Sequence, residues 1–189
     1  MSRVNWQRTI DQILLTGTGG DDRILGLTSV RRVSGVSLVS RYLARTLAAD
    51  QLQVLLLDLS EAKSALSMDV DGPPDLGSIG EQIVASGQGY DLLVGGSSEP
   101  DHGALVGLPR LRGLLRTEFA NYARIVIDMP PVLDESALGV NSIAASAMCD
   151  RLLLVTRIGR DKRAELTEVL SLLRGAGVRP SALLANKFK

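Results

Sequence analysis

The chain has 189 residues, 45% of them hydrophobic, which is enough for one domain with a full core. Lys and Arg together number 21, and Asp and Glu together also number 21, so the net charge is zero. No net charge favours binding to nucleic acid or anionic lipid, and we expect no nucleic-acid partner. The single cysteine, Cys149, excludes an intrachain disulfide and a cysteine-cluster metal site and favours a core thiol. Without 18 consecutive apolar residues or an apolar signal region, we expect a cytoplasmic protein with no direct membrane insertion.

The N-terminal part differs from the rest in composition. Residues 3–15 place apolar side chains among polar ones at helical spacing, which predicts an amphipathic helix. The Gly-rich residues 16–22 then predict a linker. We therefore expect a single domain, 1–189, made of an N-terminal helix and linker (1–20) and a core (24–189).

Within the core, short runs of Leu, Val and Ile alternate with longer amphipathic stretches. The apolar runs predict strands over 24–28, 53–57, 90–94, 124–128, 152–156 and 182–185. The amphipathic stretches predict helices over 36–49, 79–85, 109–119, 136–148 and 162–175. Continuous apolar strands alternating with helices indicate a parallel sheet covered on both faces. The predicted fold class is therefore α/β, a doubly wound and mainly parallel sheet.

Several of these segments carry more detailed expectations. In the helix over 36–49 we expect five buried side chains: Leu38, Val39, Tyr42, Leu43 and Leu47. The helix over 109–119 should bury its leucines and present Arg110, Arg112 and Arg116 on its outer face. Residues 61–80, rich in Ser, Asp, Gly and Pro, predict a long loop that is functional or mobile. The only histidine, His102, lies in a second loop without a partner at ligand spacing and favours a solvated residue over a catalytic base.

The stretch from Ile24 to Ser37 joins the first strand to the first long helix. A strand, a loop and a helix start form the setting in which backbone N–H groups and the helix dipole converge on a phosphate. The Walker A consensus is G-x-x-x-x-G-K-[S/T], in which the Lys reaches the β and γ phosphates and the hydroxyl ligates magnesium. Gly35 and Ser37 match its last Gly and its hydroxyl, but Val36 stands at the Lys position and Val30 at the first Gly. The loop therefore has the setting of a phosphate site without its main cation.

Two carboxylates, Asp58 and Asp128, each end a predicted buried strand. Ligands of such sheets bind outside the carboxyl ends of the strands, where the loop over 29–37 is also expected. These three features thus predict one site at one edge of the sheet. The alternative is that both carboxylates only cap the polar ends of buried strands.

Five motifs in order carry a resemblance to a known family: TSVRRVSGVS, VLLLDLS, IVIDMPPV, DRLLLVTRIGRDKRAEL and ALLANKF. They resemble the bacterial tyrosine kinases (BY-kinases) of capsule and exopolysaccharide synthesis, which belong to the ParA/MinD branch of P-loop ATPases. The similarity extends from about Asn5 to Phe188. The Walker B segment, with Asp128, Pro130 and Pro131, matches the family pattern without change.

The phosphate loop departs from the family pattern T-S-x-x-P-G-x-G-K-S. Arg32 replaces Pro, Val33 replaces Gly and Val36 replaces Lys. Loss of the Lys should lower a phosphoryl-transfer rate by about two to three or more powers of ten. Val33 places a Cβ where we expect φ > 0, which costs about 1 kcal/mol or more if the loop keeps its shape.

Other family motifs are also altered. The second Walker motif, D-x-D in the family, retains Asp58 but has Ser60 as its second residue. Of the family's subunit-contact motif E-x-x-R-x-x-R, only Arg8 remains, because Asn5 and Asp11 stand at the outer positions. The tyrosine cluster that family members carry at the C-terminus is absent, so the sequence offers no obvious acceptor for autophosphorylation in the family manner.

The resemblance implies a set of site residues. The relict catalytic residues would be Asp58 and Asp128, and Ser37 with Asp128 would hold magnesium if it is bound. The cofactor-binding positions would be Ser29, Arg31, Arg32, Gly35 and Ser37. Arg31 coincides with an extra lysine of ParA/MinD relatives and could grip phosphate bidentately, although a solvated loop face explains Arg31 and Arg32 equally well. The expected cofactor is ATP or ADP with magnesium, bound weakly or not at all.

Two functions from different classes follow. The favoured one is a non-catalytic relative of the BY-kinase domain, a cytoplasmic binding or regulatory subunit of exopolysaccharide or capsule assembly. Its partner would be a membrane chain-length-determinant protein, which would bring it to the inner face of the plasma membrane, or an active kinase paralogue; self-assembly stays open. The alternative is an active ATPase or tyrosine kinase with an altered site, in which Ser37 and Asp128 hold magnesium, Asp58 orients water or the acceptor hydroxyl, and Arg31 neutralises the γ phosphate. A partition-type ATPase ranks last, since neither a basic run for DNA nor a C-terminal amphipathic helix is present.

Overall fold

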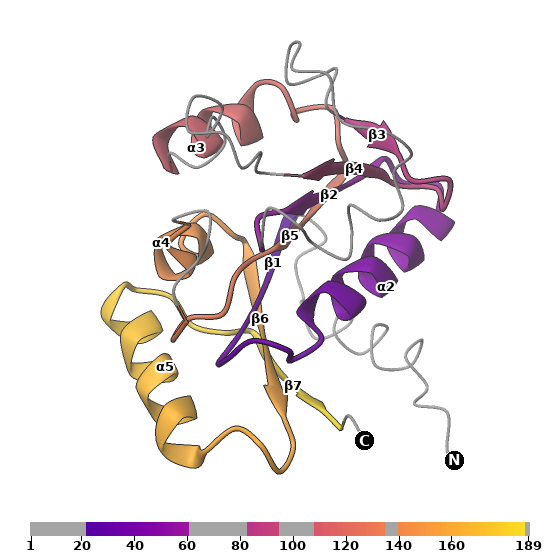
Figure 1. Cartoon of the computed structure of the whole chain (residues 1–189). Helices are drawn as coiled ribbons and strands as arrows, with labels where there is room; N and C mark the ends of the chain where they lie inside the picture. Colours follow the sequence, from indigo (N-terminus) through magenta and orange to yellow (C-terminus); the bar gives the residue numbers. More distant parts are fainter. Residues whose placement is uncertain (1–21, 61–82, 95–107, 135–139, 188–189) are drawn as a thin grey trace.

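The computed structural model describes residues 22–60, 83–94, 108–134 and 140–187 (Figure 1). The predicted N-terminal helix, the whole loop over 61–80 and His102 lie outside these residues. Within the described ranges, no helix has the length and apolar character needed to cross a membrane.

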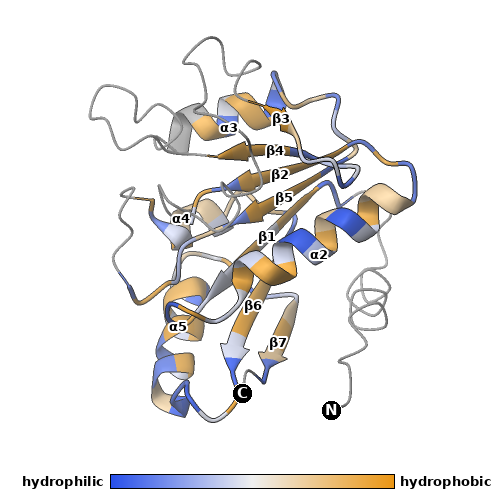
Figure 2. Ribbon diagram, turned by 45° about the vertical axis from the view of Figure 1, so that its right-hand side comes forward, coloured by the Kyte–Doolittle hydropathy of each residue, from blue (hydrophilic) through white to orange (hydrophobic). Residues whose placement is uncertain are grey.

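The centre of the molecule is a seven-stranded sheet with the order β3-β4-β2-β5-β1-β6-β7. Its strands are β1 (Ile24–Ser29), β2 (Val54–Asp58), β3 (Val84–Ala85), β4 (Asp91–Val94), β5 (Arg124–Asp128), β6 (Arg151–Arg157) and β7 (Ala182–Asn186). All neighbouring pairs run parallel except β3 with β4. The central strands are almost wholly hydrophobic (Figure 2), as expected for a parallel sheet that is covered on both faces.

Helices cover both faces of this sheet (Figure 1). They are α2 (Val36–Ala49), α3 (Leu108–Arg116), α4 (Ser142–Ser146) and α5 (Arg163–Gly175). Helix α2 packs on one face through a cluster that includes Val39, Leu43 and Leu47. The other three helices contribute to a second cluster on the opposite face, in which Leu111 of α3 and Val169 of α5 are buried. The predicted doubly wound α/β fold is confirmed.

Cys149 lies beside the central strand β1. A Cβ added at Gly26 would overlap the Sγ of Cys149 and come within 2.8 Å of the Met129 side chain, so the thiol packs directly on the strand backbone. Burial raises the pKa of this thiol to about 12. Cys149 as a whole is partly buried and packs against the core, in agreement with the expected core thiol.

The structure corrects the predicted burial of α2. Leu38 and Tyr42 are exposed, whereas Val36, Ser40 and Ala44 face the sheet with the expected Val39, Leu43 and Leu47. The buried residues follow the i, i+3, i+4, i+7 spacing of one helix face, and small side chains at 40 and 44 let the helix lie close to the strands. Sequence hydropathy favoured the larger Leu and Tyr, which lie off this face.

Three elements differ from the prediction by more than one residue at an end or in type. A helix was predicted over 79–85, but Val84 and Ala85, at its end, form strand β3 because they pair with the edge of β4. The helix predicted over 136–148 is described only as α4, whose start is fixed by Asn141, since its side chain accepts a hydrogen bond from the Ala144 N–H at 3.0 Å. Helix α3 ends at Arg116, and its predicted faces are confirmed where side chains are described.

Candidate functional site

Strands β1, β2 and β5 end at the same edge of the sheet, and the chain leaves β1 there into the loop that precedes α2. Asp58 and Asp128 are register partners on the neighbouring strands β2 and β5. Residue 27 of β1 is in turn the register partner of Asp128. The sequence prediction that both carboxylates and the loop lie at one edge of the sheet is therefore confirmed.

Asp58 is fully buried and is held in place by the residue two positions later. The backbone N–H and the hydroxyl of Ser60 both donate to Asp58 Oδ1, at 2.9 and 2.6 Å. Ser60 stands where the family pattern has a second acid. Here it acts as a neutral donor that orients the remaining carboxylate.

Asp128 is also fully buried, and within the described ranges neither of its carboxylate oxygens has a hydrogen-bond partner of normal geometry. Burial, and then the nearby charge of Asp58, raise the pKa of Asp128 well above its ordinary value. The Ser37 hydroxyl and the charge of Arg41 oppose this rise only in part. Two buried carboxylates beside a hydroxyl form an oxygen donor set that suits a proton or a hard divalent cation.

The loop between β1 and α2 contains two left-handed residues. Gly35, directly before α2, has φ 83°, and Val33 has φ 59°. The positive φ predicted for Val33 is thus confirmed, and its side chain is 81% exposed rather than packed. A left-handed residue directly before a helix that has no acid in its first turn is compatible with an anion cradle at the helix start.

The lysine position of this cradle is filled by an apolar side chain. Val36 is the first residue of α2, is only 8% exposed, and belongs to the cluster between α2 and the sheet with Leu27 and Val39. The first turn of α2 therefore offers backbone N–H groups and the Ser37 hydroxyl, but no ammonium group.

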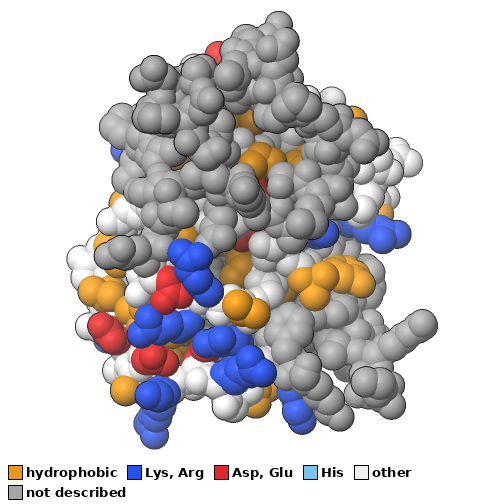
Figure 3. Space-filling view, in the orientation of Figure 1, with side chains coloured by type: hydrophobic (Ala, Val, Ile, Leu, Met, Phe, Trp, Pro, Cys, Tyr) orange, Lys and Arg blue, Asp and Glu red, His pale blue; other side chains and the backbone are white. Residues whose placement is uncertain are grey.

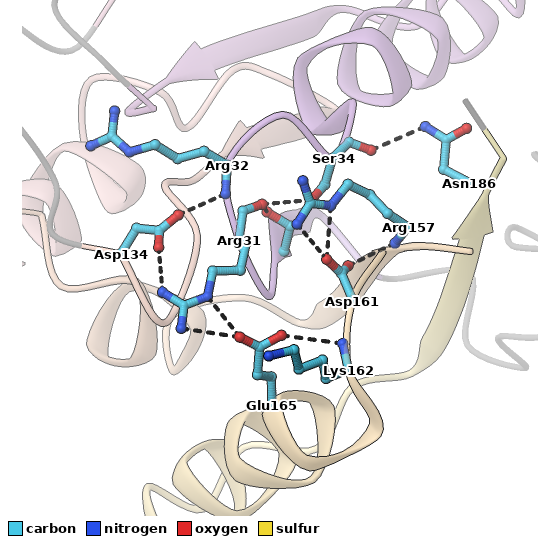
Figure 4. A network of polar contacts seen from close by, with 10 residues as sticks. Arg31, Arg32, Ser34, Asp134, Arg157, Asp161, Lys162, Glu165 and Asn186 are labelled. Atoms are coloured by element: carbon cyan, nitrogen blue, oxygen red, sulfur yellow. Dashed lines mark hydrogen bonds and ion pairs between the residues drawn. The ribbon is translucent and has the colours of Figure 1, made fainter. Parts of the chain in front are cut away.

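Arg31, a cation of the loop, forms ion pairs with two carboxylates (Figure 4). Its NH1 donates to Asp134 Oδ1 at 2.8 Å and to the Leu133 carbonyl at 3.4 Å. Its Nε and NH2 both lie 3.2 Å from Glu165 Oε1, near the start of α5. Arg31 thus connects the loop to the segment after β5 and to the start of α5.

Hydrogen bonds inside the loop involve a residue predicted to bind cofactor. The Ser29 hydroxyl donates to the Arg31 carbonyl at 2.9 Å, and the Ser34 hydroxyl donates to the same carbonyl at 2.5 Å. From β7, the Asn186 amide donates to the Ser34 carbonyl at 3.0 Å. The Ser29 hydroxyl therefore shapes the loop, and the loop is attached to β7.

Arg32 contributes its backbone rather than its side chain to this network. The Arg32 N–H donates to Asp134 Oδ2 at 2.7 Å, while its side chain extends away from Asp134 and Arg31 (Figure 4). On the face shown in Figure 3, Lys and Arg side chains gather over the lower part of the molecule with Asp and Glu side chains between them. This surface mixes charges and is not a uniform basic patch.

Sequence reasoning missed Asp134, Glu165 and Asn186. Asp134 stands six residues after Asp128, Glu165 lies in the first turn of α5, and Asn186 lies in the C-terminal motif ALLANKF. The available signals were the spacing after the Walker B segment and the acid in the first helical turn. Neither signal identifies Arg31 as the partner, since these contacts span more than 100 residues.

The curated proteins that the chain resembles in sequence include tyrosine-protein kinases. CpsD, a tyrosine-protein kinase of Streptococcus agalactiae, is 26% identical over 185 residues, which cover 90% of this chain and 77% of CpsD. EpsB of Ralstonia nicotianae, a putative tyrosine-protein kinase, is 30% identical over 190 residues, but these cover only 24% of EpsB. No model of a protein family matches the chain.

Solved structures give the same result for the fold. The VpsO kinase domain superposes with a TM-score of 0.81 at 25% identity, covering 97% of this chain and 94% of that domain. MinD from Aquifex aeolicus, at 18% identity, superposes with a TM-score of 0.62 over 88% of this chain and 70% of its own and supports the fold alone.

The fold is the one seen in ParA-family ATPases and in MinD. Within this class, the chain is a homologue of the bacterial tyrosine kinases, as its five motifs predict.

Proposed function

We propose that this domain is a non-catalytic relative of the BY-kinases that serves as a cytoplasmic binding or regulatory subunit in exopolysaccharide or capsule biosynthesis. The observation that carries the proposal is Val36, a buried apolar side chain at the position where a phosphate loop needs its lysine. Phosphoryl transfer depends almost wholly on positioning and on charges that stabilise the transferring group. A loop without that cation is a poor catalyst even where its backbone cradle is kept.

Magnesium and ATP are the cofactors that the fold implies, and the residues present fit them unequally. The buried oxygens of Asp128, beside Asp58 and near the Ser37 hydroxyl, suit a divalent cation, which would be held by Ser37 and Asp128. A bound magnesium ion would supply charge neutralisation for phosphate oxygens. The loop supplies N–H groups for the phosphates but no lysine, so we propose weak nucleotide binding or none.

A second candidate, an active ATPase or tyrosine kinase with an altered site, is favoured by the paired carboxylates. In that function Asp58 would orient water or an acceptor hydroxyl, and Arg31 would neutralise the γ phosphate. Arg31 would first have to leave Asp134 and Glu165. For this reason we favour the non-catalytic function, in which the partner is a membrane chain-length-determinant protein or an active kinase paralogue.

Isothermal titration of the purified chain with ATP and magnesium tests the proposal. We expect no heat of binding at micromolar ATP and no rise in the melting temperature of the chain under the same conditions. Binding at 100 times the dissociation constant would add about 2.7 kcal/mol to the free energy of unfolding, which a thermal shift would detect. Micromolar affinity together with ATP turnover would overturn the non-catalytic function in favour of the altered active site.

A further inference from the structure

We propose that the phosphate loop is closed by its own protein anions: Asp134 and Glu165 bind Arg31 as a ligand's phosphates would, and an external anion must displace them. We call Arg31, Asp134 and Glu165 the Arg31 latch. The latch adds to the proposed function, on which it rests only for the choice of ligand. It gives the loop an internal block that is separate from the missing lysine.

The position of Asp134 supports this inference most directly. One of its oxygens accepts from the Arg31 guanidinium at 2.8 Å, and the other accepts from the Arg32 backbone N–H at 2.7 Å (Figure 4). A guanidinium together with a backbone N–H of a loop before a helix is the donor set that proteins use for phosphate. In this chain, a carboxylate from the segment after β5 occupies that donor set.

Glu165 occupies the other side of the guanidinium. Oε1 of Glu165 lies 3.2 Å from both Nε and NH2 of Arg31, while Oε2 accepts from the Lys162 N–H at 3.1 Å. The side chain of Glu165 is therefore also held by the backbone at the start of α5, independently of its contact with Arg31. All three nitrogens of the guanidinium have an acceptor, so a phosphate that binds Arg31 through two nitrogens must displace a carboxylate from at least one of them.

The charges of the latch agree with its geometry. Partial burial would raise the pKa of Asp134, but hydrogen bonds from Arg31 and from the Arg32 N–H outweigh it and lower that pKa. The Lys162 N–H, and then Arg31, lower the pKa of Glu165. Both acids are thus stabilised as carboxylates, and they compete with an incoming anion as full charges. The binding free energy of an incoming anion is therefore only the difference between its own contacts with Arg31 and the contacts of Asp134 and Glu165 that it displaces.

The test measures anion affinity after the latch is neutralised. Magnesium–ATP and inorganic triphosphate are titrated calorimetrically into the parent chain, into the Asp134→Asn and Glu165→Gln variants, and into the double variant. We expect at least tenfold tighter binding of both ligands by the double variant than by the parent, with smaller gains for each single variant. Adding Arg31→Ala to the double variant should abolish the gain, because the freed guanidinium is its source.

Glu168→Gln is the matched control, since it removes the same charge one turn further along α5 from an exposed side chain. We expect less than a twofold change for this control. Equal affinities for parent and double variant, or a similar gain for Glu168→Gln, would overturn the latch. Thermal melts of each variant show whether it is folded, and an unfolded double variant leaves the two single variants to decide. A parent that binds ATP at micromolar affinity and turns it over would contradict the proposed function, whereas the latch is judged by the ratio between the affinities of the variants.

Discussion

The paired carboxylates and the phosphate loop lie at the same edge of the sheet but have diverged to different extents. Asp58 and Asp128 are held by strand register, on β2 and β5, at the place where the family pattern has them. The loop has the expected backbone turn at Gly35, but its side chains differ: Val36 at the lysine position, Val33 in a left-handed conformation, and Arg31 bound to Asp134 and Glu165. Positions fixed by a sheet keep their geometry, whereas a loop can exchange ligand contacts for contacts with its own chain.

The two regions also differ in energetic terms. Asp128 is buried without a described hydrogen-bond partner for its oxygens, which is an unfavourable environment for a charge. Arg31 of the loop, in contrast, is paired with two carboxylates. The environment of Asp128 therefore favours binding of a proton or a cation. Arg31 already has anionic partners within the protein. Three substitutions test this contrast.

The largest effect is expected for Asp128→Asn. The raised native pKa of Asp128 means that the folded chain binds more protons than the unfolded chain between the two pKa values, so stability is full below the unfolded value near 4 and falls as pH rises. The loss is up to about 1.4 kcal/mol per pH unit in that window. Asparagine carries no such charge, so the variant should be more stable than the parent near pH 7, by a margin that shrinks at lower pH.

Urea unfolding from pH 4 to 8, with a chelator present, measures this difference. Asp50→Asn, an exposed position at the end of α2, is the control and should leave the pH dependence unchanged. A parent and an Asp128→Asn variant with the same pH dependence would show that the buried carboxylate is not strained. The contrast with the loop would then fail.

A smaller effect is expected for Val36→Lys, which restores the family residue in the loop. Removing the buried valine should lower the free energy of unfolding by about 1–3 kcal/mol, because its side chain packs in the cluster between α2 and the sheet. Each charge-assisted hydrogen bond from the new ammonium group to phosphate is worth roughly 1.5–3 kcal/mol, so ATP affinity should rise. Chemical denaturation and calorimetry measure the two changes.

Val36→Met is the control for Val36→Lys, since it changes the volume at residue 36 without adding a charge. We expect it to affect stability but not ATP binding. If Val36→Lys gains no affinity, Asp134→Asn and Glu165→Gln are added to it. A gain would then show that the Arg31 latch blocked the loop, and no gain would show that the loop backbone is not a working cradle.

Sequence patterns predicted the fold and the location of the site because both depend on local rules. Continuous apolar runs identified six of the seven strands, and only β3, a two-residue edge strand, was taken for a helix. Asp58 and Asp128 could be placed because the last residues of parallel strands meet at one edge. The left-handed Val33 could be predicted because Gly is the family residue there, and its positive φ is confirmed.

The contacts of Arg31 could not be predicted in the same way. A phosphate grip and a solvated loop face were the two alternatives for this residue, and neither of them named the pairing with Asp134 and Glu165 that the structure shows. These partners come from segments that are distant in sequence and become neighbours only after the sheet and α5 have formed. Periodicity and motif spacing describe neighbours along one element, so a contact among three elements has no pattern in the sequence.

The smallest effect is expected for Val33→Gly, which tests whether the loop really holds a left-handed residue. A β-branched residue at φ 59° costs about 1–2 kcal/mol, and the 81% exposed side chain repays little of this by packing. Glycine removes the strain but adds freedom to the unfolded chain, so the net gain in stability should be at most about 1 kcal/mol. Val33→Ala keeps most of the strain and should change stability much less, as measured by urea unfolding. Destabilisation by glycine but not by alanine would mean that residue 33 is not held at positive φ, and the loop would then lack the backbone shape that an anion cradle needs.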